Sequence, residues 1–98
     1  MDQIRLLRTI KPVLLKEGFV IDGVVGSVAR GQKGRDLDLL YHLEEPFFTR
    51  HPGFKAFARL EEIKMLLSQR LGVPVDLVAA SSLSKTAKAH MMKDLLDV

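Results

Sequence analysis

The chain of 98 residues carries 15 basic and 12 acidic side chains, which give a formal net charge of +3, and 47% of its residues are hydrophobic. This length and hydrophobic fraction predict a single domain over residues 1–98 and exclude a disordered chain. The absence of cysteine excludes disulfides, thiolate metal sites and cysteine nucleophiles. The mild positive charge suits an anionic ligand such as a nucleotide, and it would equally suit weak attraction to RNA.

The sequence contains no signal for export or membrane insertion. No apolar run approaches the roughly 18 residues of a membrane span. The opening stretch MDQIRLLRTI lacks the long apolar segment of a signal peptide. We therefore expect a soluble, cytoplasmic protein that does not interact with a membrane.

The first quarter of the chain predicts a helix followed by a strand. Apolar residues recur at helical spacing over residues 2–17, where Pro12 removes a backbone donor and predicts a kink or a late helix start. Gly18 is a suitable C-terminal cap for this helix. The run FVIDGVV, residues 19–25, reads as a strand.

The next segment, GSVARGQKGRDLDLLYHL, combines turn residues with a second strand. Gly26 and Ser27 end the first strand, and Ser27 would cap a short helix through VARG. GQKG, residues 31–34, predicts a turn. Residues 36–43 alternate as in a strand, so that Asp36, Asp38, Leu40 and His42 share one face and Leu37, Leu39, Tyr41 and Leu43 share the other.

The second half predicts a loop, a long helix, a strand and a closing helix. EEPFFTRHPG, residues 44–53, reads as a loop. Residues 54–71 predict the clearest helix, with one apolar stripe formed by Phe54, Phe57, Leu60, Ile63, Leu67 and Leu71. VPVDLVAA, residues 73–80, reads as a short strand, and residues 81–98 read as a polar turn and a helix. The order α-β-α-β-α-β-α predicts an α/β sheet of about three strands covered by helices, with the strand directions left open.

Three aspartates stand out in the predicted strands. Asp36 and Asp38 project from one face, so their carboxylates would share a small volume and repel each other unless a cation lies between them. A hard divalent cation such as Mg²⁺ prefers such oxygen ligands. Asp76 adds a third carboxylate in an otherwise apolar strand. The alternatives are structural: Asp36 as a turn residue, Asp38 on a solvated sheet face, and Asp76 as a charge at a strand edge.

The Gly26-Ser27 step before the carboxylates is suited to binding phosphate. Glycine allows close approach to the backbone, and a helix N-terminus offers unpaired N–H groups. Cationic side chains follow directly, at Arg30, Lys33 and Arg35. A phosphate cradle beside a metal-binding carboxylate pair is what nucleotidyl transfer requires. The alternatives are that the loop cations belong to a solvated turn or that Arg30 holds the short helix in place.

At these residues the sequence resembles the minimal nucleotidyltransferases of the DNA polymerase β superfamily. Their signature of Gly-Ser, a short basic loop, Asp-x-Asp and a later carboxylate reads here as GSVARGQKGRDLDLLY and VPVDLV. The resemblance implies the nucleotidyltransferase fold, a small mixed sheet of about three strands flanked by helices. It implies that Gly26 and Ser27 bind nucleotide phosphates and that Asp36 and Asp38 ligate one or two Mg²⁺ ions. Asp76 would be the third metal ligand or the base.

The sequence departs from this family's pattern in the loop before the carboxylates. Arg35 occupies a position where the family often has serine, and the loop between Gly-Ser and Asp-x-Asp is short. Lys33 and Arg35 would contact the outer phosphates, with Arg30 nearby. These departures bear on nucleotide choice and on the geometry of the loop, while every proposed metal ligand is present.

The resemblance also implies a reaction and a partner. The reaction would be attack of an acceptor hydroxyl on the α-phosphorus of ATP, which transfers AMP and releases pyrophosphate. Small members of the family resemble the antitoxins of toxin–antitoxin modules of the type VII kind, whose partner is an all-helical HEPN-domain ribonuclease that is silenced by AMP on a tyrosine. The alternative is a non-catalytic antitoxin that neutralises its partner by binding alone. A nucleic-acid-binding domain ranks last, because no segment is strongly basic.

Two further features have both a functional and a structural interpretation. His42 lies on the face of the aspartates and would either line the site or, as we expect, be a polar residue at the far end of the strand. Phe47, Phe48 and Phe54 would form a partner or base-stacking patch if exposed, whereas we expect burial against the long helix. An open sheet edge would also allow a homo-oligomer.

Overall fold

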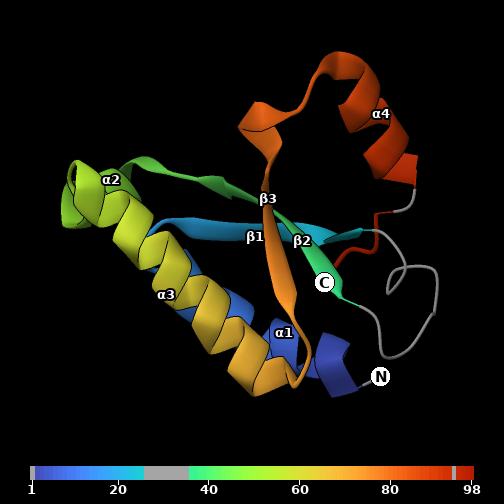
Figure 1. Ribbon diagram of the computed structural model, residues 1–98, viewed down its shortest axis with the longest axis horizontal. Helices are drawn as coiled ribbons and strands as arrows, with labels where there is room; N and C mark the ends of the chain where they lie inside the picture. The colour runs from blue at the N-terminus through green and yellow to red at the C-terminus, as the bar shows by residue number, and fades with distance from the viewer. Residues whose placement is uncertain (1, 26–35, 94) are drawn as a thin grey trace.

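The computed structural model describes residues 2–25, 36–93 and 95–98 (Figure 1). The predicted short helix after Ser27 and the predicted turn at 31–34 lie outside these residues. The elements in chain order are α1 (Asp2–Leu15), β1 (Phe19–Val25), β2 (Leu37–Leu43), α2 (Glu45–Arg50), α3 (Phe54–Leu71), β3 (Val75–Ala79), a 3₁₀ turn (Ala80–Ser82) and α4 (Lys85–Lys93). No helix among the described residues is long and apolar enough to cross a membrane.

The three strands form one mixed sheet in the order β1-β2-β3. β1 and β2 are antiparallel, and their pairing shifts register between Ile21 and Gly23, so that Asp22 is the extra residue of a bulge. β2 and β3 are parallel. A parallel pair needs a crossover connection, which α2 and α3 provide between residues 44 and 74. The predicted small α/β sheet is therefore confirmed, and the strand directions, left open by the pattern, are now assigned.

One face of the sheet packs against α1 and α3. Alternate residues of β2, namely Leu37, Leu39 and Tyr41, join this core, as the period of two predicts. Tyr41 stacks on Phe19 with ring centroids 4.8 Å apart. The helices contribute their apolar stripes to the same cluster: Ile4, Leu7 and Leu14 from α1, and Ile63, Leu67 and Leu71 from α3.

The predicted loop over 44–53 is wrong, because its middle forms the helix α2. Pro46 stands in the first turn of this helix, where its missing N–H is not needed. Phe47 is completely buried, and its backbone N–H would lie 2.6 Å from a Cβ on Gly18, which has φ 93°. The close approach of α2 to the end of α1 thus depends on glycine at this position.

The predicted apolar stripe of α3 is wrong in its first turns. Phe54 and Phe57 are 89% and 69% exposed, although both were expected in the core. The side of α3 that packs against the core instead begins at Ala56 and continues through Leu60 and Ile63. Phe47 from α2 is buried in this core, whereas Phe48 is 53% exposed. The expected burial of the neighbouring phenylalanines therefore holds for Phe47 alone.

The predicted closing helix is also too long, because the chain is extended after α4. Leu96 forms an antiparallel bridge with Val24 in β1, with N···O distances of 2.9 and 2.8 Å. Leu95 and Leu96 approach Gly23 so closely that a Cβ there would lie 2.6 Å from Leu95 Cδ1. This segment uses backbone groups at the free edge of β1, a tertiary demand that overrides the local helical pattern.

Candidate functional site

The three aspartates singled out by the sequence lie at one end of the sheet. Asp36 directly precedes β2, Asp38 lies within it, and Asp76 lies in β3. Asp38 pairs in register with Asp76 across the parallel strands, and with Val25, the last residue of β1, on its other side. Since Leu37 and Leu39 point into the helix-covered core, Asp38 and Asp76 project from the opposite face.

The electrostatics of Asp38 indicate that these carboxylates affect one another. Asp38 is partly buried, whereas Asp36 and Asp76 are exposed. Burial raises the pKa of Asp38 above its ordinary value, and the negative charges of Asp76 and Asp36 raise it further. The structure therefore places the three aspartates at one end of the sheet, where the charges of Asp36 and Asp76 act on Asp38.

The donor chemistry of this cluster suits a hard divalent cation. Carboxylate oxygens are the ligands that Mg²⁺ prefers, and a cation among them would relieve the repulsion that adds to the effect of burial on the Asp38 pKa. Within residues 2–25, 36–93 and 95–98, no three acidic or histidine side chains already have the spacing of a metal-ligand set. Ligation by Asp36, Asp38 and Asp76 accordingly stays a prediction.

A lysine that the sequence reasoning did not single out contacts this cluster. Lys64 Nζ, from α3, lies 3.8 Å from Asp76 Oδ1. Both side chains are substantially exposed, so this ion pair contributes little to stability. No local pattern marks Lys64, because its proximity to Asp76 follows only from the packing of α3 beside β3. The contact supplies one positive charge next to the third carboxylate.

The residues predicted to bind nucleotide phosphates lie outside the described residues. These residues are Gly26, Ser27, Arg30, Lys33 and Arg35. β1 ends at Val25, whose register partner is Asp38, so the chain enters this segment beside the carboxylates. The predicted phosphate cradle and the individual roles of these five residues stay predictions.

His42 lies at the other end of β2, away from the carboxylates. Its Nδ1 is 2.9 Å from both carboxylate oxygens of Asp22, the bulge residue of β1. Four residues separate His42 from Asp38 along the strand, which corresponds to about 13 Å. The structure therefore favours the interpretation of His42 as a polar strand-end residue held by Asp22.

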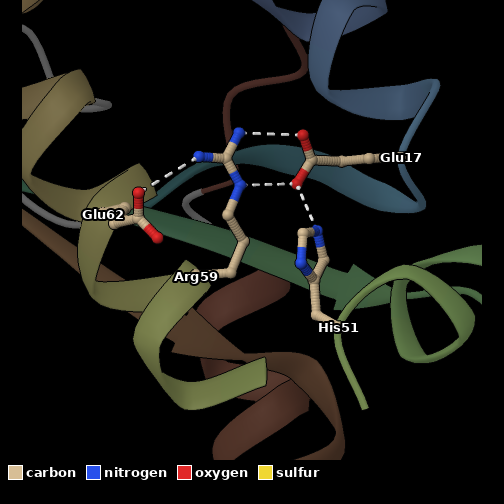
Figure 2. Close-up of polar contacts among 4 residues, drawn as sticks. All are labelled: Glu17, His51, Arg59 and Glu62. Atoms are coloured by element: carbon tan, nitrogen blue, oxygen red, sulfur yellow. Dashed lines mark hydrogen bonds and ion pairs between the residues drawn. The ribbon is translucent and has the colours of Figure 1, made fainter. Parts of the chain in front are cut away.

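A second polar cluster lies on the helical side of the molecule and joins three segments (Figure 2). Glu17 accepts hydrogen bonds from Arg59 Nε and Nη2 at 2.8 and 2.9 Å. His51 Nε2 lies 3.3 Å from Glu17 Oε1, outside hydrogen-bonding geometry, and Glu62 lies 3.9 Å from Arg59 Nη1. The hydrogen bond from Arg59 is the main reason that the pKa of Glu17 is lowered. This cluster links the ends of α1 and α2 to α3 and has a structural role.

The comparisons with known proteins bear on the whole chain. No protein-family model matches the sequence, and no curated protein matches it. A solved structure described as "Structure of putative minimal nucleotidyltransferase" matches with a TM-score of 0.70 and 31% sequence identity, over 99% of this chain and 94% of that one. The chain belongs to the minimal nucleotidyltransferase family.

Membership of the minimal nucleotidyltransferases agrees with the fold described above. The match extends over nearly the full length of both chains, so it includes the sheet that carries Asp38 and Asp76 as well as the helices that cover it. The fold class expected from the resemblance is confirmed, and the function is nucleotidyltransferase-like.

Proposed function

We propose that this minimal nucleotidyltransferase transfers AMP from ATP to a hydroxyl group of a protein acceptor in a Mg²⁺-dependent reaction. The acceptor we propose is a tyrosine of a small, all-helical HEPN-type ribonuclease that the transfer silences. The observation that carries the catalytic part is the alignment of Asp38 with Asp76 at the end of the sheet where Asp36 also lies. Family membership supports the transferase class.

In the proposed reaction the acceptor oxygen attacks the α-phosphorus of ATP. A new oxygen–phosphorus bond forms, the bond between the α-phosphorus and the bridging oxygen breaks, and pyrophosphate leaves. The acceptor proton passes to a carboxylate, a role for which we propose Asp76. Mg²⁺ bound by Asp36, Asp38 and Asp76 would neutralise charge on the phosphates and favour ionisation of the acceptor. Gly26 and Ser27 would hold the phosphates through backbone N–H and hydroxyl groups.

A protein acceptor is compatible with the small number of elements in the described structure. The helices α1, α2 and α3 and the three strands share one hydrophobic core, and no second core forms a separate substrate-recognition unit among the described residues. An acceptor that brings its own binding surface would complete such a site. The identity of that acceptor as a HEPN-type ribonuclease rests on the family resemblance of the sequence.

The test is transfer of labelled AMP. The protein is incubated with labelled ATP and Mg²⁺, with and without a small helical protein encoded by a neighbouring gene, and each product is measured by intact mass. We expect an AMP adduct on the helical protein, lost on chelation of Mg²⁺ and in the Asp38→Asn and Asp76→Asn variants. Asp97→Asn, an exposed aspartate in the C-terminal segment, is the matched control.

Two results would contradict the proposal. Undiminished transfer by the Asp38→Asn variant would remove the carboxylate cluster from the mechanism. A tight complex with the helical protein that carries no label, and that still forms with Asp38→Asn, would instead favour neutralisation by binding alone.

A further inference from the structure

The helices α1 and α3 lie on the same side of the sheet (Figure 1). A groove on this side is lined by residues of both helices. Its volume is about 220 Å³. The groove ends at the Glu17–Arg59 pair, near the end of α1 and the beginning of α3. Its lining is formed by Thr9, Ile10, Val13, Leu14, Glu17, Arg59, Leu66 and Arg70. None of these residues belongs to the carboxylate cluster on the opposite face of the sheet.

The walls of this groove expose apolar side chains to water. Val13 of α1 is 63% exposed, although its helical spacing predicts a core position, and Leu66 of α3 is 39% exposed. Leu6, two turns before Val13 in α1, is also 39% exposed. An apolar surface that is both concave and open to solvent is typical of a binding site for another molecule.

The surroundings of the groove are positively charged. Arg70 lines it, and Arg5 lies one turn before Thr9 on the same side of α1. Neither arginine forms an ion pair with a described carboxylate. Glu17, the acidic residue of the lining, is already paired with Arg59. Over residues 2–17 and 54–71, eight basic residues outnumber four acidic ones. Lys64 is one of the eight but lies beside Asp76, so the charge at the groove itself comes from Arg70 and Arg5.

The helical walls, volume and length of the groove indicate which kind of molecule it can bind. Both walls are α-helices whose backbone groups, apart from the turn at Pro12, are bonded within the helix, so they offer no edge to an added strand. The volume of about 220 Å³ is below the range of about 300–1,000 Å³ that is typical of small-molecule sites. Along α3 the wall extends from Arg59 to Arg70, about 16 Å at the rise of an α-helix, which is long enough for the apolar i, i+3/i+4, i+7 stripe of a docked helix.

We propose that this groove binds an amphipathic helix of a partner protein, with aliphatic side chains seated between Val13 and Leu66 and acidic side chains beside Arg70 and Arg5. This inference does not depend on the proposed transfer reaction, because the groove and the carboxylates lie on opposite faces of the sheet. A helix bound here leaves Asp38 and Asp76 accessible.

The test uses two synthetic peptides of about 18 residues that share one leucine stripe at helical spacing. One peptide has glutamate along both flanks of the stripe and the other has lysine. Binding to the full chain is measured by fluorescence anisotropy and mapped by NMR chemical shifts. We expect only the glutamate peptide to bind, with chemical-shift changes at the groove. Its affinity should fall at least tenfold for Val13→Glu, Leu66→Glu and Arg70→Glu. Its affinity for Asp38→Asn should equal that for the wild type.

Matched controls come from exposed apolar neighbours outside the groove. Leu15 and Met65 are 46% and 62% exposed. Each is the sequence neighbour of a residue that lines the groove, Leu14 and Leu66 respectively. The controls are Leu15→Glu and Met65→Glu. These variants should bind the glutamate peptide as the wild type does. Equal binding of both peptides, absence of binding, or equal weakening by the control variants would overturn the proposal. So would a dimer of this chain that Val13→Glu dissociates, or binding to anionic lipid vesicles that Val13→Glu abolishes.

Discussion

Asp38 and Asp76 stand at paired positions of the parallel strands β2 and β3, so that both carboxylates project from the face of the sheet that α1 and α3 leave uncovered. Asp38 is partly buried there, and the charges of Asp76 and Asp36 act on it. The two negative charges repel each other, so this pairing lowers stability relative to apolar residues at the same positions. Such an arrangement is expected where a cation binds.

The first prediction concerns Asp38→Asn and stability. The pKa of Asp38 is raised in the folded protein, so ionisation of this group destabilises the fold once the pH exceeds its unfolded value of about 3.8. Without added metal, Asp38→Asn should therefore raise Tm by a few degrees at pH 7. The difference in Tm should vanish below pH 3.8, where Asp38 is neutral in both the folded and the unfolded protein. Thermal unfolding followed by circular dichroism at the two pH values measures this.

Added Mg²⁺ gives the same variant a second readout. If the carboxylates bind Mg²⁺, the ion should raise the Tm of the wild type, because binding to the native state stabilises it. The Tm of Asp38→Asn, which lacks one of the carboxylates, should stay unchanged. Asp97→Asn should respond to pH and Mg²⁺ as the wild type does. A lower Tm for Asp38→Asn at pH 7 would contradict the electrostatic account.

The second prediction concerns the Glu17–Arg59 pair. The Glu17 side chain is 12% exposed, so Arg59→Met leaves a nearly buried carboxylate without its two hydrogen bonds and should cost about 2 kcal/mol. The pKa of Glu17 is lowered, so this stabilisation should be fully present above about pH 4.5 and decline as the pH falls toward the folded value. Urea unfolding at pH 7 and pH 3.5 would show a smaller difference at the lower pH.

Glu62 provides the control for this pair. Its carboxylate is 3.9 Å from Arg59 and its side chain is 67% exposed, so Glu62→Gln should change the free energy of unfolding by less than about 0.5 kcal/mol. A loss at Glu62 equal to that at Arg59 would show that the network, and not the Glu17 pair, carries the stabilisation.

The third prediction concerns Gly23→Ala. A Cβ at this position would lie 2.6 Å from Leu95 Cδ1 and 2.7 Å from the carbonyl oxygen of Leu96. The substitution should cost about 1–3 kcal/mol and displace the C-terminal segment. Hydrogen exchange of the Val24 and Leu96 amides, which bond each other's carbonyls, should then accelerate.

Gly72→Ala distinguishes displacement from general destabilisation. Gly72 has φ 72° at the end of α3, and a Cβ added there would have no other heavy atom within 4 Å, so alanine should cost about 1 kcal/mol through backbone strain alone. It should leave the relative protection of the Leu96 amide unchanged. Equal acceleration in both variants would argue against a specific contact at Gly23.

The fourth prediction separates the phenylalanines of the α2–α3 region. Phe47 is completely buried, so Phe47→Ala should cost about 3–5 kcal/mol. Phe54→Ser and Phe57→Ser should each change stability by less than about 0.5 kcal/mol, since both side chains are largely exposed. Chemical denaturation of the three variants measures the contrast, and a large cost at Phe54 would restore the burial that the sequence pattern suggested.

Local patterns were sufficient to predict the strands and the helix α3. β1 occupies the predicted residues 19–25 and α3 the predicted residues 54–71, because each element is an apolar-rich segment bounded by glycine. The spacing of Asp36, Asp38 and Asp76 was sufficient to propose one cluster. Their alignment needed the parallel register of β2 and β3, which follows from the crossover and not from either strand alone.

The errors arose where distant segments decide the local structure. α2 forms because Phe47 finds a place in the core next to Gly18, a contact invisible in the EEPFFTRHPG composition. The segment after α4 is extended because Leu96 pairs with Val24 at the free edge of β1, and because Gly23 has no side chain to block the approach of Leu95 and Leu96. Lys64 could not have been assigned to the site, since only the packing of α3 beside β3 brings it to Asp76.

The sheet divides the molecule into two faces whose substitutions should act independently. Combining Phe47→Ala on the helical side with Asp38→Asn on the carboxylate side should give free-energy changes that add within about 0.5 kcal/mol. Lys64 is the exception that the structure describes, because it extends from α3 to within 3.8 Å of Asp76. Because this ion pair is exposed, a double-mutant cycle of Lys64→Met and Asp76→Asn should give a coupling of only about 0.2–1 kcal/mol. Sequence changes in α3 can reach the carboxylates through this side chain.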